Sequence, residues 1–159
     1  MGSHVSEVPN HLVGRMTPLD TRGHVAMDGN LGYELDVTKL SIQEIDVIKA
    51  QVDLYKSIRQ TIQYGDFYRL VSPFETGNYG SIHVSKQKDA AVFIYVHTLA
   101  EANGPFKAVK LQGLDPDKDY QVIERGEVYS GDSLMHIGLN VPYANHDFKS
   151  TLYRLEAVK

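Results

Sequence analysis

The spacing of apolar residues changes at Gly65, and this change constrains the fold more than any other feature of the sequence. Before Gly65, short apolar runs alternate with patterns of period three to four, which are typical of strands and amphipathic helices in turn. After Gly65 the spacing falls to two, the period of a strand with one buried face. We therefore expect a β-α-β-α unit over residues 1–65 and an all-β unit over residues 66–159.

The first predicted helix runs from Pro18 to Asp28 and lies between two short strands. Thr17 is in position to cap this helix, proline suits its first residue, and the glycine after Asp28 is placed to end it. The strands are expected at "GSHVS" and at "NLGYELDV", where residues 31–37 alternate apolar and polar side chains. The order is thus strand, helix, strand.

The second predicted helix is long and has a single apolar face. Ser41 and Glu44 form a capping box that sets its start, and Gly65 is placed to end it. Between them, isoleucine, valine and tyrosine recur at steps of three and four from Ile42 to Ile62. This face needs a sheet to pack on, and two short strands are too few, because parallel strands are usually covered on both faces within larger sheets. We therefore expect residues 1–65 to be part of a larger assembly of strands.

Seven short strand candidates follow, separated by turn-forming residues. They are found at "DFYRLVSP", "YGSIHVSK", "AAVFIYVHTL", "FKAVKLQGL", "DYQVIERGEVYS", "SLMHIGLNVP" and "STLYRLEAVK". Strands of this number and spacing predict an antiparallel β-sandwich over residues 66–159. The acidic stretch "DPDKD" lacks the glycine and the distal glutamate of an EF-hand loop, so we interpret it as a turn.

Composition argues against several classes of partner. The net charge of −4 comes without a lysine or arginine cluster, so the sequence offers no basic surface for nucleic acid. No apolar run is long enough to span a bilayer, and the N-terminus lacks the order of a secretion signal, so we expect no membrane association. With no cysteine there is neither a disulfide framework nor a thiolate nucleophile, which fits a reducing cytoplasm.

Four stretches of the chain carry a family resemblance. They are "MGSHVSEVPNH", "GRMTPLDTRGHVAMDGNLGYELD", "YGDFYRLVSPFE" and "LQGLDPDKDYQV". The first three resemble the C-terminal quarter of bacterial α-galactosidases of glycoside hydrolase family 36, and the fourth is similar to the C-terminal β-domain of those enzymes. The opening stretch reads much like the corresponding stretch of the family, so we expect "MGSH" to be native and not the remnant of an expression tag.

The resemblance implies the last two β-α units of a (β/α)8 barrel over residues 1–65 and a C-terminal β-sandwich domain over residues 66–159. Enzymes of this family are retaining hydrolases that remove terminal α-linked galactose from sugars such as melibiose and raffinose, with two aspartates as nucleophile and acid/base. Their motifs, similar to "KWD" and to "SDD" or "SDN", are absent here. We therefore expect the C-terminal portion of such an enzyme, without a catalytic residue or a cofactor, and inactive alone.

Three residues are candidates for contact with the galactoside substrate. His4 and Ser6 lie at the end of the first strand, and barrel sites form at the C-terminal ends of strands. Asn30 has similar standing just before the second strand. The alternative for each side chain is a structural hydrogen bond inside the barrel.

Other polar residues suggest no catalytic or metal site. Glu34 and Asp36 share a strand face, but neighbouring acids on one strand would hardly flank a sugar from opposite sides. We interpret Glu34 as lining the barrel mouth and Asp36 as turning the chain toward the next helix. The spacing of His4, His11 and His24 matches no common zinc pattern, so no metal site is predicted.

A non-catalytic function is the alternative to a hydrolase fragment. Residues 66–159 would then form a carbohydrate-binding or assembly module that presents two or three tyrosines on one sheet face. The tyrosines available for this role are Tyr79, Tyr95, Tyr120, Tyr129, Tyr143 and Tyr153. Under the hydrolase interpretation, the partners are the α-galactoside substrate, the rest of the barrel, and further copies of the chain in a homo-oligomer.

Overall fold

The computed structural model describes residues 2–158, which fall into two groups of elements. The βα segment, residues 2–65, contains β1 (Gly2–Ser6), α1 (Leu19–Met27), β2 (Asn30–Glu34), a 3-10 turn (Val37–Lys39) and α2 (Ile42–Tyr64). The β segment, residues 66–158, contains β3 (Asp66–Val71), α3 (Pro73–Thr76), β4 (Asn78–Val84), β5 (Ala90–His97), β6 (Lys107–Val109), β7 (Asp119–Val122), β8 (Glu127–Ser130), α4 (Gly131–His136), β9 (Leu139–Val141) and β10 (Lys149–Ala157).

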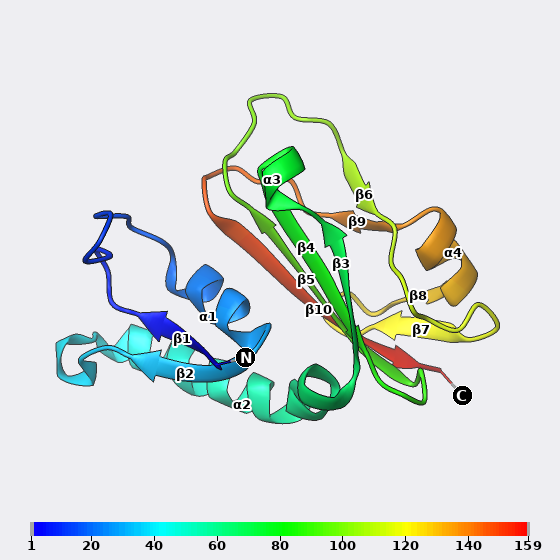
Figure 1. Ribbon diagram of the computed structural model, residues 1–159, viewed down its shortest axis with the longest axis horizontal. Helices are drawn as coiled ribbons and strands as arrows, with labels where there is room; N and C mark the ends of the chain where they lie inside the picture. The colour runs from blue at the N-terminus through cyan, green and yellow to red at the C-terminus, as the bar shows by residue number, and fades with distance from the viewer. Residues whose placement is uncertain (1, 159) are drawn as a thin grey trace.

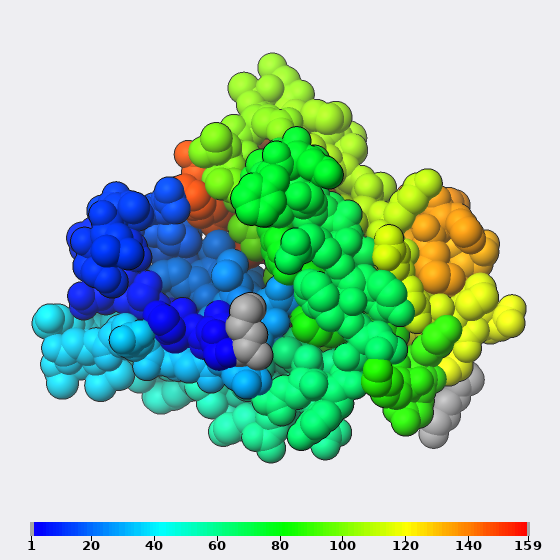
Figure 2. Space-filling view, viewed as in Figure 1, coloured from blue at the N-terminus to red at the C-terminus, as the bar shows by residue number. Residues whose placement is uncertain are grey.

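One large sheet runs through the middle of the molecule. It is antiparallel and has six strands in the order β3-β4-β5-β10-β7-β8. The strands β6 and β9 pair separately, and β1 and β2 form a parallel pair. Figure 1 shows α1 and α2 on one side of the sheet, with β6, β9 and α4 toward the other. In Figure 2 the βα segment, in blue and cyan, forms the left part of the molecular surface.

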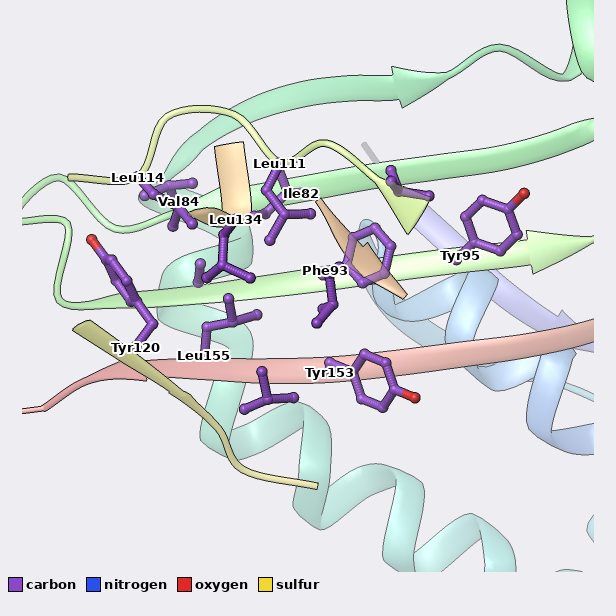
Figure 3. Close-up of a cluster of buried hydrophobic side chains, with 14 of the residues drawn as sticks. Ile82, Val84, Phe93, Tyr95, Leu111, Leu114, Tyr120, Leu134, Tyr153 and Leu155 are labelled. Carbon is purple, nitrogen blue, oxygen red and sulfur yellow. The ribbon is translucent and has the colours of Figure 1, made fainter. Parts of the chain in front are cut away.

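The strand β5 is buried on both faces, because successive side chains of a strand point to opposite sides. On one face, Val92 and Ile94 belong to a cluster with Met27 of α1 and with Ile58 and Ile62 of α2. The other face forms the larger core. Figure 3 shows side chains of this core from β4, β5, β7 and β10 together with Leu111, Leu114 and Leu134, which come from the covering segments. The sheet is therefore a wall shared by the two segments.

The predicted bounds of α2 and its capping box are confirmed. The Ser41 hydroxyl accepts a hydrogen bond from the Glu44 backbone N–H (3.2 Å), and the Glu44 carboxylate accepts one from the Ser41 backbone N–H (2.9 Å). The helix ends at Gly65, where a Cβ would lie 2.6 Å from the Val84 carbonyl oxygen of β4. Glycine is needed at this position because the end of α2 approaches the backbone of β4 closely.

The apolar residues at the two ends of α2 differ in burial. Ile42 is 75% exposed, whereas Ile58 and Ile62 are buried against the large sheet. Each large apolar side chain left in water forgoes about 1.5 to 3 kcal/mol. The exposed start of α2 is consistent with the expectation that two short strands are too few to cover this helix. None of the helices within residues 2–158, the long α2 included, meets the length and apolarity that a bilayer crossing requires.

The helix α1 begins one residue later than predicted. Pro18 is the residue that precedes the helix, with an extended ψ of 145°, so Thr17 lies outside the helix and no side chain caps it. The strand expected over residues 31–37 is β2 at Asn30–Glu34, because the chain then enters the 3-10 turn. The predicted β-α-β-α order is confirmed.

One strand prediction in the β segment is wrong. The stretch "SLMHIGLNVP" begins within α4, and only Leu139–Val141 of it forms a strand. The Ser130 hydroxyl accepts a hydrogen bond from the Ser133 backbone N–H (3.1 Å), and this cap favours a helical turn over extended chain. The stretch "DYQVIERGEVYS" is a hairpin of β7 and β8. The β segment thus has one large antiparallel sheet, and a two-stranded ribbon and α4 cover one face of it.

A largely buried carboxylate joins the two segments. Asp28, directly after α1, accepts hydrogen bonds from the Tyr79 hydroxyl, from Ser81 Oγ (2.9 Å) and from His83 Nε2 (2.8 Å). These three residues alternate along β4 and therefore share its face toward α1. Burial by itself would raise the pKa of Asp28, but the hydrogen bonds from His83, Tyr79 and Ser81 outweigh it and hold that pKa below its usual value.

A second polar contact joins α1 to β10. Thr21 Oγ1 donates to the Phe148 carbonyl oxygen (2.6 Å) and lies 2.9 Å from Ser150 Oγ. His24 Nδ1 lies 2.7 Å from the same Ser150 oxygen. Burial lowers the pKa of His24, with Asp20 and Glu124 opposing that shift. Burial therefore favours the neutral form of this histidine where the helix meets the sheet.

We expect Asp28→Asn to lower the free energy of unfolding by about 2 to 3 kcal/mol, because a buried charged hydrogen-bond acceptor is removed from three donors. Asp53→Asn is the matched control, since Asp53 lies on exposed α2 surface with only an ion pair to Lys56. Denaturant unfolding of both variants measures the difference. Equal stability of the two variants would show that the Asp28 contacts do not hold the segments together.

We expect the free energy of unfolding to fall as the pH drops below about 6.5, the usual histidine pKa. His24 has a lowered pKa in the folded chain, so the unfolded chain takes up its proton first. The neutral His24 therefore contributes to the free energy of unfolding at pH values above its pKa in the unfolded chain. This contribution is lost as the pH falls through its pKa in the folded chain. Denaturant unfolding at a series of pH values should give a shallower slope for His24→Asn, and an unchanged slope would contradict the assignment.

Candidate functional site

The carboxyl ends of β1 and β2 lie at the same edge of their parallel pair. The register joins Gly2 to Asn30 at one end and Ser6 to Glu34 at the other. The Val5 side chain is fully buried, so its neighbours in β1 point to the opposite face. The residues on that face are Gly2, His4 and Ser6. The predicted candidates His4 and Ser6 therefore share one face of the strand.

Glu34 joins these residues from the neighbouring strand. Its Oε2 lies 3.0 Å from His4 Nε2, and the two side chains are 75% and 55% exposed. Tyr33, next to Glu34, points the other way, because its hydroxyl donates to Gln51 Oε1 on α2 (2.9 Å). The face away from the helices thus carries a histidine, a serine hydroxyl and a carboxylate, all able to hydrogen-bond a polar ligand.

Asn30 is not brought together with His4 and Ser6. It lies at the start of β2, four residues from Glu34, which at about 3.3 Å per residue is on the order of 13 Å along the strand. Its Oδ1 accepts a hydrogen bond from Gln63 Nε2 on α2 (3.2 Å). The three predicted candidates therefore occupy opposite ends of the strand pair.

Glu34 and Asp36 have separate partners. Asp36 precedes the 3-10 turn and accepts hydrogen bonds from the Thr38 backbone N–H (3.0 Å) and from the Thr38 hydroxyl (2.6 Å). These bonds lower the pKa of Asp36, and Lys39 adds to the shift. Asp36 thus turns the chain toward α2, as the sequence indicates, and does not pair with Glu34 across a substrate.

Arg22 supports the end of β1, a role that the sequence did not predict. Its Nη1 donates to the Ser6 carbonyl oxygen (2.5 Å) and its Nε donates to the Thr17 carbonyl oxygen (3.0 Å). Burial lowers the pKa of Arg22, with the charge of Glu44 opposing that shift. The guanidinium therefore holds both ends of the loop between β1 and α1. The available signal was a lone arginine within a helix of mostly small and apolar residues.

The three histidines considered for a metal lie in different surroundings. His4 is beside Glu34, and His24 is against Ser150. His11 lies in the exposed loop between β1 and α1. Within residues 2–158, no three histidine, aspartate or glutamate side chains come together in a way that would hold a metal ion.

The comparisons with known proteins match both segments. The Melibiase family model matches residues 1–65, and the model described as Glycosyl hydrolase family 36 C-terminal domain matches residues 80–155. Alpha-galactosidase AgaA of Geobacillus stearothermophilus is 50% identical over 159 residues, which cover 100% of this chain and 22% of that protein. Alpha-galactosidase Mel36A of Lactobacillus acidophilus is 45% identical over 158 residues, which cover 99% and 21%.

The fold is shared as well as the sequence. A crystal structure of the family 36 α-galactosidase AgaA from Geobacillus stearothermophilus in complex with raffinose matches with a TM-score of 0.97 and 50% identity. That match covers 99% of this chain and 22% of the other. The chain spans about a fifth of the length of the curated relatives it matches. With both segments matched in sequence and the whole fold shared, the chain belongs to glycosyl hydrolase family 36, where it corresponds to a C-terminal portion of the α-galactosidases.

Proposed function

We propose that this chain is the C-terminal portion of a retaining α-galactosidase that removes terminal α-linked galactose from sugars such as raffinose and melibiose. The observation that carries the proposal is the similarity over the whole chain, at 50% identity and a TM-score of 0.97, to an α-galactosidase in complex with raffinose. In the complete enzyme the chain supports the substrate site. It is inactive by itself.

The βα segment is proposed to supply the last two β-α units of a (β/α)8 barrel, and residues 66–159 the C-terminal β-sandwich domain. The parallel pairing of β1 with β2 and the exposed start of α2 support this division. Both suit a sheet that continues with further parallel strands, because such sheets are covered on both faces. The large antiparallel sheet begins directly after Gly65, at β3.

His4 and Ser6 are proposed to contact the galactoside. They share the face of β1 that points away from the helices, near the carboxyl ends of the strands, where barrel enzymes place their sites. Glu34 then acts as a positioning residue, because its carboxylate lies within hydrogen-bond distance of the His4 ring. Arg22 positions the same strand end through the Ser6 carbonyl.

No catalytic residue is assigned to this chain. Retaining hydrolysis needs two carboxylates about 5 to 5.5 Å apart, one on each side of the scissile bond. Glu34 is engaged with His4, and Asp36 caps a turn. Both catalytic carboxylates are therefore proposed to lie on earlier barrel strands of the complete enzyme, and this chemistry calls for neither metal nor cofactor.

Three of the six tyrosines named for the alternative carbohydrate-binding module are not available to a ligand. That module requires two or three exposed tyrosines on one face of the sheet. Tyr95, Tyr120 and Tyr153 are instead buried in the core, where Figure 3 shows them among aliphatic side chains. We therefore do not propose a stacking platform on the sheet.

We also propose that the complete enzyme is a cytoplasmic homo-oligomer. The absence of cysteine from the sequence suits a reducing compartment. Exposed apolar side chains on the loop between β1 and α1 suit burial against other parts of the enzyme or further copies. These side chains are Leu12, Val13 and Met16.

A chimera tests the proposed function. We expect an aryl α-galactoside to be hydrolysed when residues 1–159 replace the matching region of the Geobacillus α-galactosidase, at a rate within about a factor of ten of that enzyme. The shared fold should complete the barrel. The same enzyme without this region is the negative control, and a folded chimera without turnover would refute the proposal. The 159-residue chain alone should show no turnover, and activity that survives purification would refute the upstream location of the carboxylates.

The same chimera tests the substrate face. We expect His4→Ala to lower kcat/KM by about tenfold or more, because a side chain that contacts the sugar is lost. His136→Ala is the matched control, since this histidine lies on α4 with its side chain 74% exposed. Steady-state kinetics on melibiose measures both variants. Equal values for the two variants would exclude His4 from the substrate site.

A further inference from the structure

A cavity of about 610 Å³ lies where the end of α2 meets β3 and β4. Its wall combines Asn30 and Gln63 of the βα segment with Phe67, Arg69 and Tyr79 of the β segment. In Figure 1 this junction is at the lower centre, where α2 turns into β3. It is at the opposite end of the β1–β2 pair from Ser6 and Glu34, and its volume suits a small-molecule site.

Several polar side chains on this wall have donors or acceptors that make no hydrogen bond within the described residues. Gln63 Nε2 donates to Asn30 Oδ1 (3.2 Å) and to the Tyr55 hydroxyl (3.3 Å). Within residues 2–158, no hydrogen bond uses the Asn30 amide nitrogen or the Gln63 amide oxygen, and the Arg69 guanidinium has neither a hydrogen bond nor an ion pair. Five guanidinium donors and two amide groups are thus available to a ligand.

Asp28 adds an acceptor at the inner wall. Its Oδ1 accepts from Ser81 and His83, and its Oδ2 accepts from Tyr79. An ionised carboxylate has about four lone-pair sites, so one remains for a ligand hydroxyl. Because Asp28 lines the cavity, the acceptor is available on the same wall as the donors.

The charges of the wall oppose one another. Burial and the hydrogen bond to Asp28 raise the pKa of Tyr79 to about 12, the charge of Asp28 adds to this shift, and Arg69 opposes it. Both charges therefore act on the same tyrosine. An anionic ligand drawn to Arg69 would approach the Asp28 carboxylate, and a cationic one would approach Arg69, so the wall favours a neutral ligand.

An aromatic ring lies beside the buried histidine in the wall of the cavity. Phe67 is 47% exposed, and its ring lies 5.1 Å from the His83 ring, centroid to centroid, at 57°. His83 is buried, and its Nδ1 has no hydrogen-bond partner within residues 2–158. The half-exposed Phe67 ring therefore offers the cavity an apolar face for stacking, next to a histidine whose Nδ1 is unpartnered within the described residues.

We propose that this cavity binds a neutral polyhydroxylated ligand, one or two sugar residues in size. Sugar hydroxyls both donate and accept, which matches the Asp28 acceptor, the amides of Asn30 and Gln63, and the donors of Arg69. The C–H face of a sugar ring packs on Phe67. An apolar ligand would cover the same polar groups without replacing their bonds to water.

Titration of the 159-residue chain with galactose and with melibiose, followed by NMR of the backbone amides, tests this site. We expect shifts confined to the residues around Asn30, Gln63 and Arg69. Phe67→Ala should weaken the affinity about tenfold or more, and Arg69→Gln should weaken it while keeping the Phe67 ring. Phe106→Ala is the matched control, since the Phe106 side chain is 99% exposed and lies far from the cavity in the chain. Phe106 ends the connection between β5 and β6, and this connection forms the tip at the top of Figure 2.

Several outcomes would overturn the proposal. These are the absence of shifts with millimolar sugar, shifts centred elsewhere, and equal loss in Phe67→Ala and Phe106→Ala. Inorganic phosphate is the third probe, and phosphate that shifts the same amides more strongly than sugar would show an anion site built on Arg69. The readout is binding, not hydrolysis, so a failure here is independent of the proposed α-galactosidase function.

Discussion

Burial of the central sheet from both sides is the constraint on which the rest of this structure depends. The middle strands β5 and β10 receive α1 and α2 on one face and the covering segments β6, β9 and α4 on the other. A sheet or helix with an apolar face must bury it against another element. If the segments were separated, Val92 and Ile94 of β5 and the end of α2 would all face water.

Hydrophobic burial alone does not set how the helices lie on the sheet, because it has no preferred direction. Hydrogen bonds do have a direction, and α1 and the residue after it make two sets of them. Asp28 bonds to side chains of β4. Thr21 and His24 bond to residues at the start of β10. Since α1 lies between β1 and β2 in the chain, fixing α1 also orients that strand pair. Under the proposed function, the β segment thereby holds the barrel edge that carries His4 and Ser6.

Local sequence signals were sufficient to predict a helix end where a few neighbouring residues determine it. The capping box of Ser41 and Glu44 and the position of Gly65 gave both ends of α2, because each acts within one turn of helix. The same reasoning explains the wrong prediction at α4. Apolar residues alternate with polar residues or glycine over residues 135–141, which predicts a strand, but the Ser130 cap starts a helical turn just before that stretch.

The candidate site shows a similar division. Placement of His4 and Ser6 near a strand end could be predicted, since the end of a strand is visible in the sequence. The contact between His4 and Glu34 and the support from Arg22 could not, because they depend on the register of β1 with β2 and on the packing of α1.

By itself, the sequence determined the order of the elements in the βα segment, the bounds of α2, and the alternation along β4 of Tyr79, Ser81 and His83 with apolar residues. Only the tertiary structure decided that this polar face of β4 is turned inward onto Asp28, more than fifty residues earlier in the chain. Alternation of polar and apolar residues indicates only that the two faces of a strand differ. The polar face of an antiparallel sheet is ordinarily the one that faces water. Which face becomes buried depends on the surface that packs against it, and here that surface brings a carboxylate able to accept all three hydrogen bonds.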